Sequence, residues 1–365
     1  METKNEFIPK TAILPGSVLK LELDERGISQ KDFADIIGMK TSNLNEYIRG
    51  RRSFTSDFSL KLEKALQIPA DIWMNLQLNY ELAVARKQKL DIDEQAALNE
   101  IEEYDKIISI KDLIKRLDIT AISYRNKLKE LNLKLNLPPA AELQVCTSHW
   151  NYFKKSDKLR TDPRMVLSWT LLAKYAVKDV HVGGEFKVSD KELIVRDLCS
   201  VLHENEDTIN KVRDILSNRG IKFSIVEKLD STPIDGYSFF DNGTPCIVVT
   251  KRRDKIDNFA FVLMHEIAHV FLHLSKNQKE EFVTFEENER VDKYEREADK
   301  FASGSLIPEK FWREAPKVEL NPYKIQQVYT SWARINNLNK WIVLGRIGHE
   351  LNFWRFREDG TRSIN

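Results

Sequence analysis

Residues 259–274 read FAFVLMHEIAHVFLHL, and this stretch decides the fold of the carboxy-terminal part of the chain. The run is largely apolar and predicts a buried helix. A charged side chain in such a helix costs free energy unless it is paired or binds a metal ion. His265 and His269 are four residues apart, so on a helix they point the same way and can share one cation. Glu266 lies beside them and can reach a water molecule bound to that cation. The alternative is a pair of structural histidines with an exposed glutamate, which the apolar surroundings disfavour.

Two imidazoles leave a catalytic zinc ion one protein ligand short when water takes the fourth position. Glu295 and Asp299 lie downstream, spaced i, i+4 on one helix face. We expect Glu295 to be the third ligand and Asp299 to support an imidazole N–H, with Glu297 as the reserve ligand. His273 falls one turn after His269. It is predicted to be a packed histidine or a hydrogen-bond donor to the transition state, with metal ligation as a further alternative.

Residues 1–86 are predicted to form a bundle of five short helices. Ser29 is suited to cap the second helix, and Gly38-Met39-Lys40 joins it to the third in a helix-turn-helix corner. Ile28, Phe33, Ile36, Ile37, Leu44 and Ile48 are the apolar set expected to lock the corner. The predicted helices begin at Pro15 and continue with residues 30–37, 41–48, 56–66 and 69–86.

The third helix carries a polar outward face suited to duplex DNA. Short polar side chains at a helix start can read base edges in the major groove, and arginines after it can bind phosphates. A solvated helix in a protein-binding bundle is the alternative, since residues 1–86 hold 12 basic and 12 acidic side chains. The predicted DNA-binding residues are Lys40, Thr41, Ser42, Asn43, Asn45, Arg49, Arg51 and Arg52.

Residues 87–137, within the predicted connector region 87–160, are strongly charged and helix-prone. The pattern from Ile110 to Leu131 is similar to another DNA-binding helix pair, but no recognition-like polar face recurs, so we expect a helical connector or dimerisation arm. The residues that follow predict helices at 163–176, 190–202 and 207–218. Strand signals at 223–227, 237–240 and 246–250, with a hairpin turn at 241–243, predict a small antiparallel sheet before the histidine helix.

The bulk composition is that of a globular protein, with 365 residues, 42% hydrophobic and 31% charged. The formal net charge of +1 excludes a protein that coats polyanions, so any nucleic-acid contact must be local. The polar start is no secretory signal, and no apolar run predicts a membrane span. Cys146, Cys199 and Cys246 are far apart, which is typical of free thiols in a reducing cytoplasm. We therefore expect a soluble cytoplasmic protein.

Residues 8–85 resemble the phage-repressor type of helix-turn-helix found in HigA antitoxins. The resemblance rests on SQKDFADIIGMKTSNLNEYIRGRR (residues 29–52) and on the later Ile-Pro-x-x-x-Trp pattern ending at Trp73. It implies a homodimer that binds double-stranded operator DNA, represses its own operon and neutralises a RelE/HigB-like ribonuclease toxin.

Residues 160–350 are similar to the ImmA/IrrE family of zinc metallo-endopeptidases. The shared features are the Ile234-Asp-Gly-Tyr-Ser-Phe-Phe segment, HEIAHVFLH (265–273), Glu295-x-Glu-Ala-Asp-x-Phe-Ala and Leu306-Ile-Pro. The resemblance implies that His265, His269 and Glu295 hold Zn²⁺ and that Glu266 is the general base. Asn often stands where this chain has Asp299, and Gly is common at Ala268.

The sequence therefore predicts a mainly α (α+β) chain with three parts. These are a helix-turn-helix domain at 1–86, a helical connector at 87–160 and a zincin-like metallopeptidase domain at 161–365. The predicted function is a DNA-binding regulator or antitoxin with a zinc-dependent endopeptidase that cleaves itself or a partner protein. The alternative is a non-enzymatic HigA-like antitoxin and autorepressor, whose metallopeptidase fold binds a toxin or senses a signal.

Overall fold

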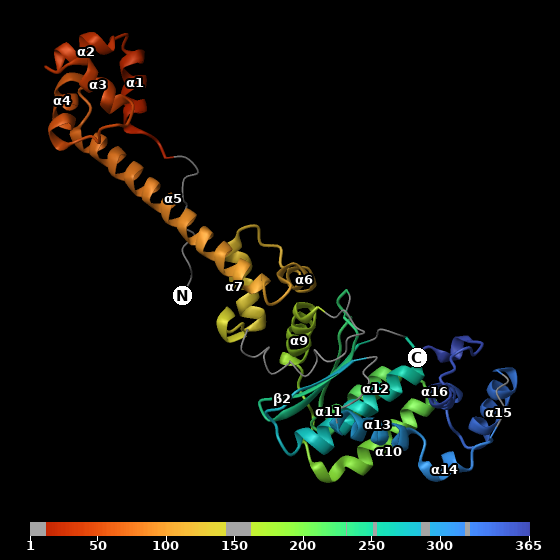
Figure 1. Ribbon diagram of the computed structural model, residues 1–365. Helices are drawn as coiled ribbons and strands as arrows, with labels where there is room; N and C mark the ends of the chain where they lie inside the picture. Colours follow the sequence, from red (N-terminus) through yellow and green to blue (C-terminus); the bar gives the residue numbers. More distant parts are fainter. Residues whose placement is uncertain (1–11, 144–161, 231, 251–253, 286–292, 318–321) are drawn as a thin grey trace. The chain divides into compact units, whose positions relative to one another are not determined.

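The computed structural model describes residues 12–143, 162–230, 232–250, 254–285, 293–317 and 322–365. The chain is mostly helical, with one small sheet (Figure 1). It divides into two compact units, residues 1–99 and 100–365, called here the amino-terminal and carboxy-terminal units. The three-part division at residues 86 and 160 stays a prediction. Cys146 lies outside the described residues.

The amino-terminal unit contains the predicted helix-turn-helix corner. Ser29 caps the second helix, since its Oγ accepts the backbone N–H of Asp32 at 3.2 Å. Gly38 follows with a φ of +67°, a left-handed conformation that favours glycine. The helices are α1 (Pro15–Glu25), α2 (Gln30–Ile36), α3 (Thr41–Ile48), α4 (Ser56–Leu66) and the start of α5 (Ala70–Asp105).

One apolar cluster holds these helices together. Its buried members come from all five helices, as the periodicity predicts. The expectation that Ile36 joins this core is wrong, because its side chain is 62% exposed, whereas Ile37, predicted together with it, is buried. Ile37 lies one helical turn after the buried Phe33, so it shares the inward face. The cluster comprises Leu19, Leu23, Phe33, Ala34, Ile37, Leu44, Ile48, Phe54, Phe58, Leu62, Leu66 and Trp73.

Helix α5 is longer than the sequence pattern indicates. We expect its end near Arg86, yet the helix runs from Ala70 to Asp105, a length of 36 residues. Residues 70–105 contain neither glycine nor proline, so nothing in the backbone chemistry stops the helix. The charged residues of this stretch therefore continue the helix and do not end it.

The carboxy-terminal unit surrounds a four-stranded sheet with helices. The sheet has the order β1-β3-β2-β4, with β1 (Lys222–Ile225), β2 (Ile234–Asp241), β3 (Thr244–Val249) and β4 (Phe282–Phe285). Before the sheet come α6 (Ile110–Arg116), α7 (Tyr124–Leu135), α9 (Pro163–Lys178), α10 (Lys191–Glu204) and α11 (Thr208–Asn218). The later helices are α12 (Ile256–Ala268), α13 (Lys293–Leu306), α14 (Glu309–Arg313), α15 (Pro322–Ile335) and α16 (Lys340–Glu350).

The sheet differs from the predicted antiparallel one. The hairpin of β2 and β3 is present, with Asn242 and Gly243 at φ of +49° and +80°. However, β1 runs parallel to β3, because β3 inserts between β1 and β2 rather than extending a meander. A fourth strand, β4, pairs with β2 and was not predicted. The short apolar runs that predict the strands do not show in which order the strands lie in the sheet.

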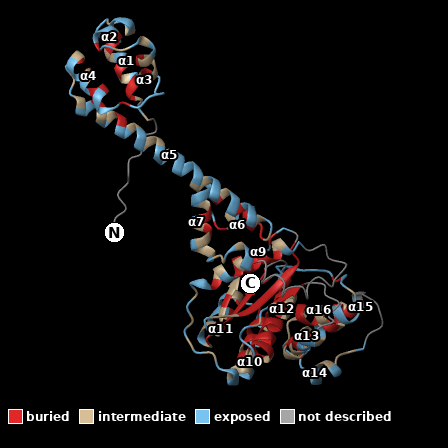
Figure 2. Ribbon diagram, turned by 60° about the vertical axis from the view of Figure 1, so that its left-hand side comes forward, coloured by how far each residue is buried: buried red, intermediate tan, exposed pale blue. Residues whose placement is uncertain are grey.

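Helix α12 is the centre of this unit. Its residues from Phe259 onward are buried, except the partly buried Phe261, and they contact β2, α13 and α16 (Figure 2). The apolar run quoted at the outset therefore forms the core and brings His265, Glu266 and His269 inside it. In the described residues, no helix is long and apolar enough to span a membrane.

We predict that Gly16→Ala destabilises the amino-terminal unit. In an open helix this change stabilises by about 1 kcal/mol. Here a Cβ on Gly16 would lie 2.3 Å from the backbone oxygens of Tyr47 and Ile48, so α1 must move off α3 at a cost of about 1–3 kcal/mol. Hydrogen–deuterium exchange should be faster in α1 and α3. Gly304→Ala is the control, since no atom lies within 4 Å of its Cβ position; equal acceleration around Gly304 would contradict the steric account.

Candidate metal centre

Three metal-binding side chains from two helical segments converge on one point. The Nε2 atoms of His265 and His269 lie 2.9 Å apart. The Glu295 carboxylate reaches both, with Oε2 3.2 Å from His265 Nε2 and Oε1 3.3 Å from His269 Nε2. His265 lies at the end of α12, His269 begins a π-helical turn (His269–Leu274), and Glu295 lies in the first turn of α13. The predicted ligand set is therefore brought together.

The hydrogen bonds on the far side of each ring indicate where its lone pair points. Asp299 Oδ1 lies 3.0 Å from His265 Nδ1, and a carboxylate there accepts the Nδ1 proton. His269 Nδ1 lies 3.0 Å from His273 Nδ1, and His273 Nε2 lies 3.3 Å from Glu297 Oε2. A consistent assignment has His269 donate to His273, which in turn donates to Glu297. Both ligand rings then turn an Nε2 lone pair toward Glu295.

This donor set fits a divalent metal ion. Two lone pairs and an anionic oxygen that face each other in a buried site repel unless a cation lies between them. Ligand atoms 2.0–2.1 Å from a tetrahedral ion are separated by roughly 3.3 Å. The observed separations of 2.9, 3.2 and 3.3 Å are close to that value. The arrangement can therefore hold one ion through His265, His269 and Glu295.

Glu295 is prepared to be an anionic ligand. Burial alone would raise the pKa of its carboxyl, but His265 and His269 in their protonated form outweigh burial and lower the pKa below its usual range; a cation held at the same point acts in the same direction. Glu297, the reserve ligand in the sequence analysis, does not face this point. It contacts His273 and Lys293 at the surface. Glu295 therefore faces the two histidines, whereas Glu297, only two residues later, does not.

Glu266 lies inside the core with one oxygen held and the other without a partner. Ser238 Oγ donates to its Oε2 at 2.5 Å. Its Oε1 is buried and accepts no hydrogen bond from any described residue. Burial raises the pKa of Glu266 to about 7, against the opposing effects of His265 and the Ser238 hydroxyl. A carboxylate with this pKa and one unused oxygen is suited to exchange protons near neutral pH.

Three residues that surround Glu266 were not assigned a role in the sequence analysis. Gly236 on β2 is required by close approach, because a Cβ there would lie 2.2 Å from Glu266 Oε1. Thr284 pairs with Gly236 in the sheet and lowers the pKa of the same carboxyl, although its Oγ1 makes no hydrogen bond of good geometry to the described residues. Ser238 is the third. A glycine inside a strand is a known sign of close backbone approach, so Gly236 offered the one usable signal.

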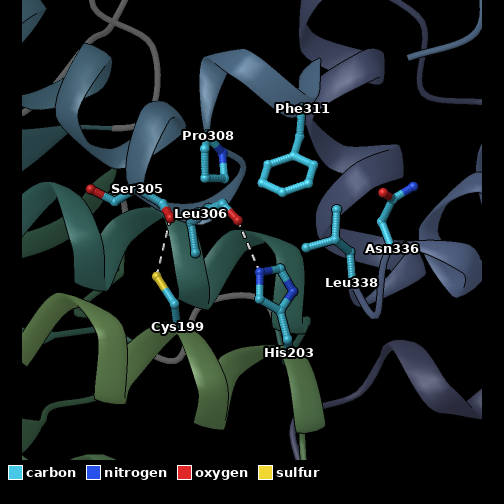
Figure 3. A pocket seen from close by; sticks show the side chains of 8 residues that line it. All are labelled: Cys199, His203, Ser305, Leu306, Pro308, Phe311, Asn336 and Leu338. Atoms are coloured by element: carbon cyan, nitrogen blue, oxygen red, sulfur yellow. Dashed lines mark hydrogen bonds between the residues drawn. The ribbon is translucent and has the colours of Figure 1, made fainter. Parts of the chain in front are cut away.

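A cavity elsewhere in the carboxy-terminal unit has different chemistry. It has a volume of about 240 Å³, and eight residues line it, among them Cys199, His203 and Phe311 (Figure 3). The Cys199 thiol donates to the Ser305 carbonyl at 3.2 Å, and burial raises its pKa to about 12, so it is not a nucleophile. His203 bridges the Leu306 carbonyl and the Asn339 N–H, which fixes it as a neutral structural histidine. The cluster of His265, His269 and Glu295, rather than this cavity, is therefore the candidate functional site.

The predicted DNA-binding residues gather at α3. Lys40 is the N-cap residue of α3, and Arg49 is its C-cap residue. Thr41, Asn43 and Asn45 are partly buried, whereas Lys40, Ser42, Arg49, Arg51 and Arg52 are exposed. Arg51 pairs with Glu46 at 3.3 Å, in an exposed ion pair that water screens.

Comparison with known proteins finds two families. Residues 19–73 match the helix-turn-helix family, and residues 220–331 match the IrrE N-terminal-like domain of a peptidase family. Virulence-associated protein I of Dichelobacter nodosus is 34% identical over 91 residues, which cover 25% of this chain and 82% of that protein.

Among solved structures, two similar chains each cover less than a quarter of this chain. A HigA-family addiction module antidote protein from Coxiella burnetii is 29% identical, with 23% of this chain and 92% of that chain covered and a TM-score of 0.22. A Pseudomonas aeruginosa protein crystallised with its 18-bp operator DNA is 33% identical, with 20% and 82% covered and a TM-score of 0.20. The chain belongs to the helix-turn-helix family through its amino-terminal region, and it carries an IrrE N-terminal-like domain around the metal-binding cluster.

Proposed function

We propose that the chain is a DNA-binding transcriptional regulator of the antitoxin type whose carboxy-terminal unit is a zinc-dependent endopeptidase. The observation that carries the proposal is the convergence of His265, His269 and Glu295 beside Glu266, a buried carboxylate whose Oε1 has no partner among the described residues. A purely structural metal site has no use for a buried carboxylate oxygen that is left without a hydrogen bond, because such an oxygen costs free energy.

The donor set favours zinc. Two imidazole nitrogens and one carboxylate oxygen, with a fourth position left open, are the ligands of catalytic zinc sites in peptidases. When bound, zinc supplies Lewis-acid polarisation of the scissile carbonyl and lowers the pKa of water.

The chain's own residues carry the proton transfer. Glu266 Oε1 takes a proton from the attacking water and delivers it to the nitrogen of the leaving amine. Ser238 holds Oε2 and so fixes the direction in which Oε1 faces. Asp299 and His273 keep the two ligand rings in one tautomer and orientation, which is the usual role of such supporting groups.

The amino-terminal region completes the proposal. In it, α3 reads operator DNA as part of a homodimer through Lys40, Thr41, Ser42, Asn43 and Asn45, and Arg49, Arg51 and Arg52 bind phosphates. The proposed protein partners are a RelE/HigB-like toxin and a cleaved protein, which is either this chain or another one. The domains are proposed at 1–86, 87–160 and 161–365.

The first prediction separates the two neighbouring glutamates. Glu295→Gln should reduce bound zinc from about one ion per chain to nearly none, because it removes the anionic ligand. Glu297→Gln is the matched control and should leave zinc in place, since Glu297 contacts His273 at the surface. Zinc is measured by inductively coupled plasma mass spectrometry on the purified chain. Loss of zinc only in Glu297→Gln would move the ligand assignment to that residue.

The second prediction concerns the base. Glu266→Gln should retain zinc and slow peptide cleavage by roughly 10²–10⁴-fold, because an amide cannot take the proton. Mass spectrometry of the chain alone, and of bacterial lysate proteins incubated with it, identifies the fragments. If the wild-type chain binds zinc yet produces no fragments, the non-enzymatic scaffold replaces the peptidase.

The third prediction tests α3. Asn43→Ala with Arg49→Ala should weaken binding to the DNA upstream of the gene by at least about tenfold, since each base or phosphate contact contributes about 1–3 kcal/mol. Fluorescence anisotropy gives the affinity. Lys31→Ala on exposed α2 surface is the charge control and should change binding far less. Unchanged binding in the double variant would reject α3 as the reading face.

A further inference from the structure

The start of helix α6 repeats the start of helix α2. Ser109-Ile-Lys-Asp112 has the same Ser-x-Lys-Asp pattern as Ser29-Gln-Lys-Asp32. In both, the serine Oγ donates to the aspartate Oδ2, at 2.5 Å for Ser109 and 2.6 Å for Ser29. Ser29 Oγ also accepts the Asp32 backbone N–H, a cap bond that Ser109 does not make. Both helices also have seven residues. The first helix of the amino-terminal DNA-binding corner thus has a counterpart in the carboxy-terminal unit.

The two helices also end alike. After α2, Gly38 takes a φ of +67°, and the next N–H, from Met39, bonds the Ala34 carbonyl at 2.9 Å. After α6, Asp118 takes a φ of +51°, and the Ile119 N–H bonds the Ile114 carbonyl at 3.0 Å. In both cases the residue after the left-handed one donates its N–H to the carbonyl five residues earlier. This turn ends the helix and redirects the chain toward a second helix.

The helix that follows, α7, has the layout of a recognition helix. Ser123 caps it by accepting the Asn126 N–H at 3.2 Å. Leu128 and Leu131 are buried on its inner face, and α7 packs against α6 and α9. The connection, residues 117–123, is longer than residues 37–40 in the amino-terminal corner. The two corners are therefore similar in their helix ends and in the capped second helix, but the loop between α6 and α7 is longer.

The outer face of α7 is polar, basic and exposed. Tyr124, Arg125, Asn126 and Lys129 are exposed, and Ile122, just before the cap, is 93% exposed. This arrangement supplies the polar face that the sequence pattern did not reveal.

The charge of the segment points to a polyanion. Residues 106–135 hold eight basic and three acidic side chains, a net charge of +5, on a chain whose total is only +1. Arg116 is engaged by Glu227 at 2.6 Å, and Lys106 by Glu103 at 2.5 Å. Lys111 and Lys115 on α6 are exposed beside α7. A local field of this sign attracts phosphates even where the whole molecule is nearly neutral.

We propose that α6 and α7 form a second helix-turn-helix corner that binds duplex DNA. The first turn of α7 enters the major groove with Asn126 toward the base edges, and Arg125 and Lys129 bind phosphates. Ile122 is placed to contact a thymine methyl group. The ligand is duplex DNA, and the binding is separate from that of α3.

The test uses the full chain and a 40-bp mixed-sequence duplex. All proteins carry Asn43→Ala and Arg49→Ala, so the comparison does not depend on whether α3 binds DNA. Within that background, Arg125→Ala with Lys129→Ala should weaken binding about tenfold at low salt. It should also reduce the slope of log affinity against log salt by about two, as expected for two lost phosphate contacts.

Lys310→Ala with Arg313→Ala on α14 is the matched control. It removes the same two charges from exposed positions of the same unit and should leave affinity and slope unchanged. Equal losses in both double variants would show a nonspecific charge effect and overturn the proposal. So would unchanged DNA binding in the α7 variant. If analytical ultracentrifugation then shows that this variant alone dissociates a dimer, α7 is an interface between two copies rather than a DNA-binding helix.

Discussion

The structure of the carboxy-terminal unit depends on one electrostatic constraint, the burial of a glutamate and two histidines in an apolar helix. Helix α12 supplies much of the core, so its polar side chains cannot reach bulk water. Ser238 on β2 donates to Glu266 Oε2, Asp299 on α13 holds the His265 ring, and His273 holds the His269 ring. Among these polar atoms, Glu266 Oε1 alone has no hydrogen-bond partner in the described residues. The sheet and α13 are therefore positioned as much by hydrogen bonding to α12 as by apolar packing.

The elements that could be predicted from sequence are those with local signals. Ser29 and Gly38 mark the ends of α2 by capping chemistry, and the alternation with Asn242-Gly243 marks the hairpin. The histidine spacing and the downstream Glu295 were predicted by helical geometry and family resemblance. Local chemistry was sufficient wherever an interaction spans four residues or fewer.

What could not be predicted depends on partners far apart in the chain. The insertion of β3 beside β1, the pairing of β4 with β2 and the contact of Ser238 with Glu266 all join distant segments. The predicted end of α5 was wrong for another reason. A charged stretch without glycine or proline is compatible either with a linker or with a continuous helix. Ile36 and Ile37 could not be ranked by hydrophobicity, since only the packing of neighbouring helices decides which one turns inward.

Gly236 also has a consequence for evolution. Its missing side chain leaves the space that the Glu266 carboxylate occupies, so the two positions cannot change independently. In a lineage that keeps the glutamate for proton transfer, selection should preserve the glycine, because a larger side chain would displace the Glu266 carboxylate. In a lineage that has lost the chemistry and keeps only the scaffold, both constraints are released together, and larger residues should accumulate at position 236. Joint retention or joint drift of this pair across homologous sequences would thus record whether the proton-transfer role proposed for Glu266 is under selection.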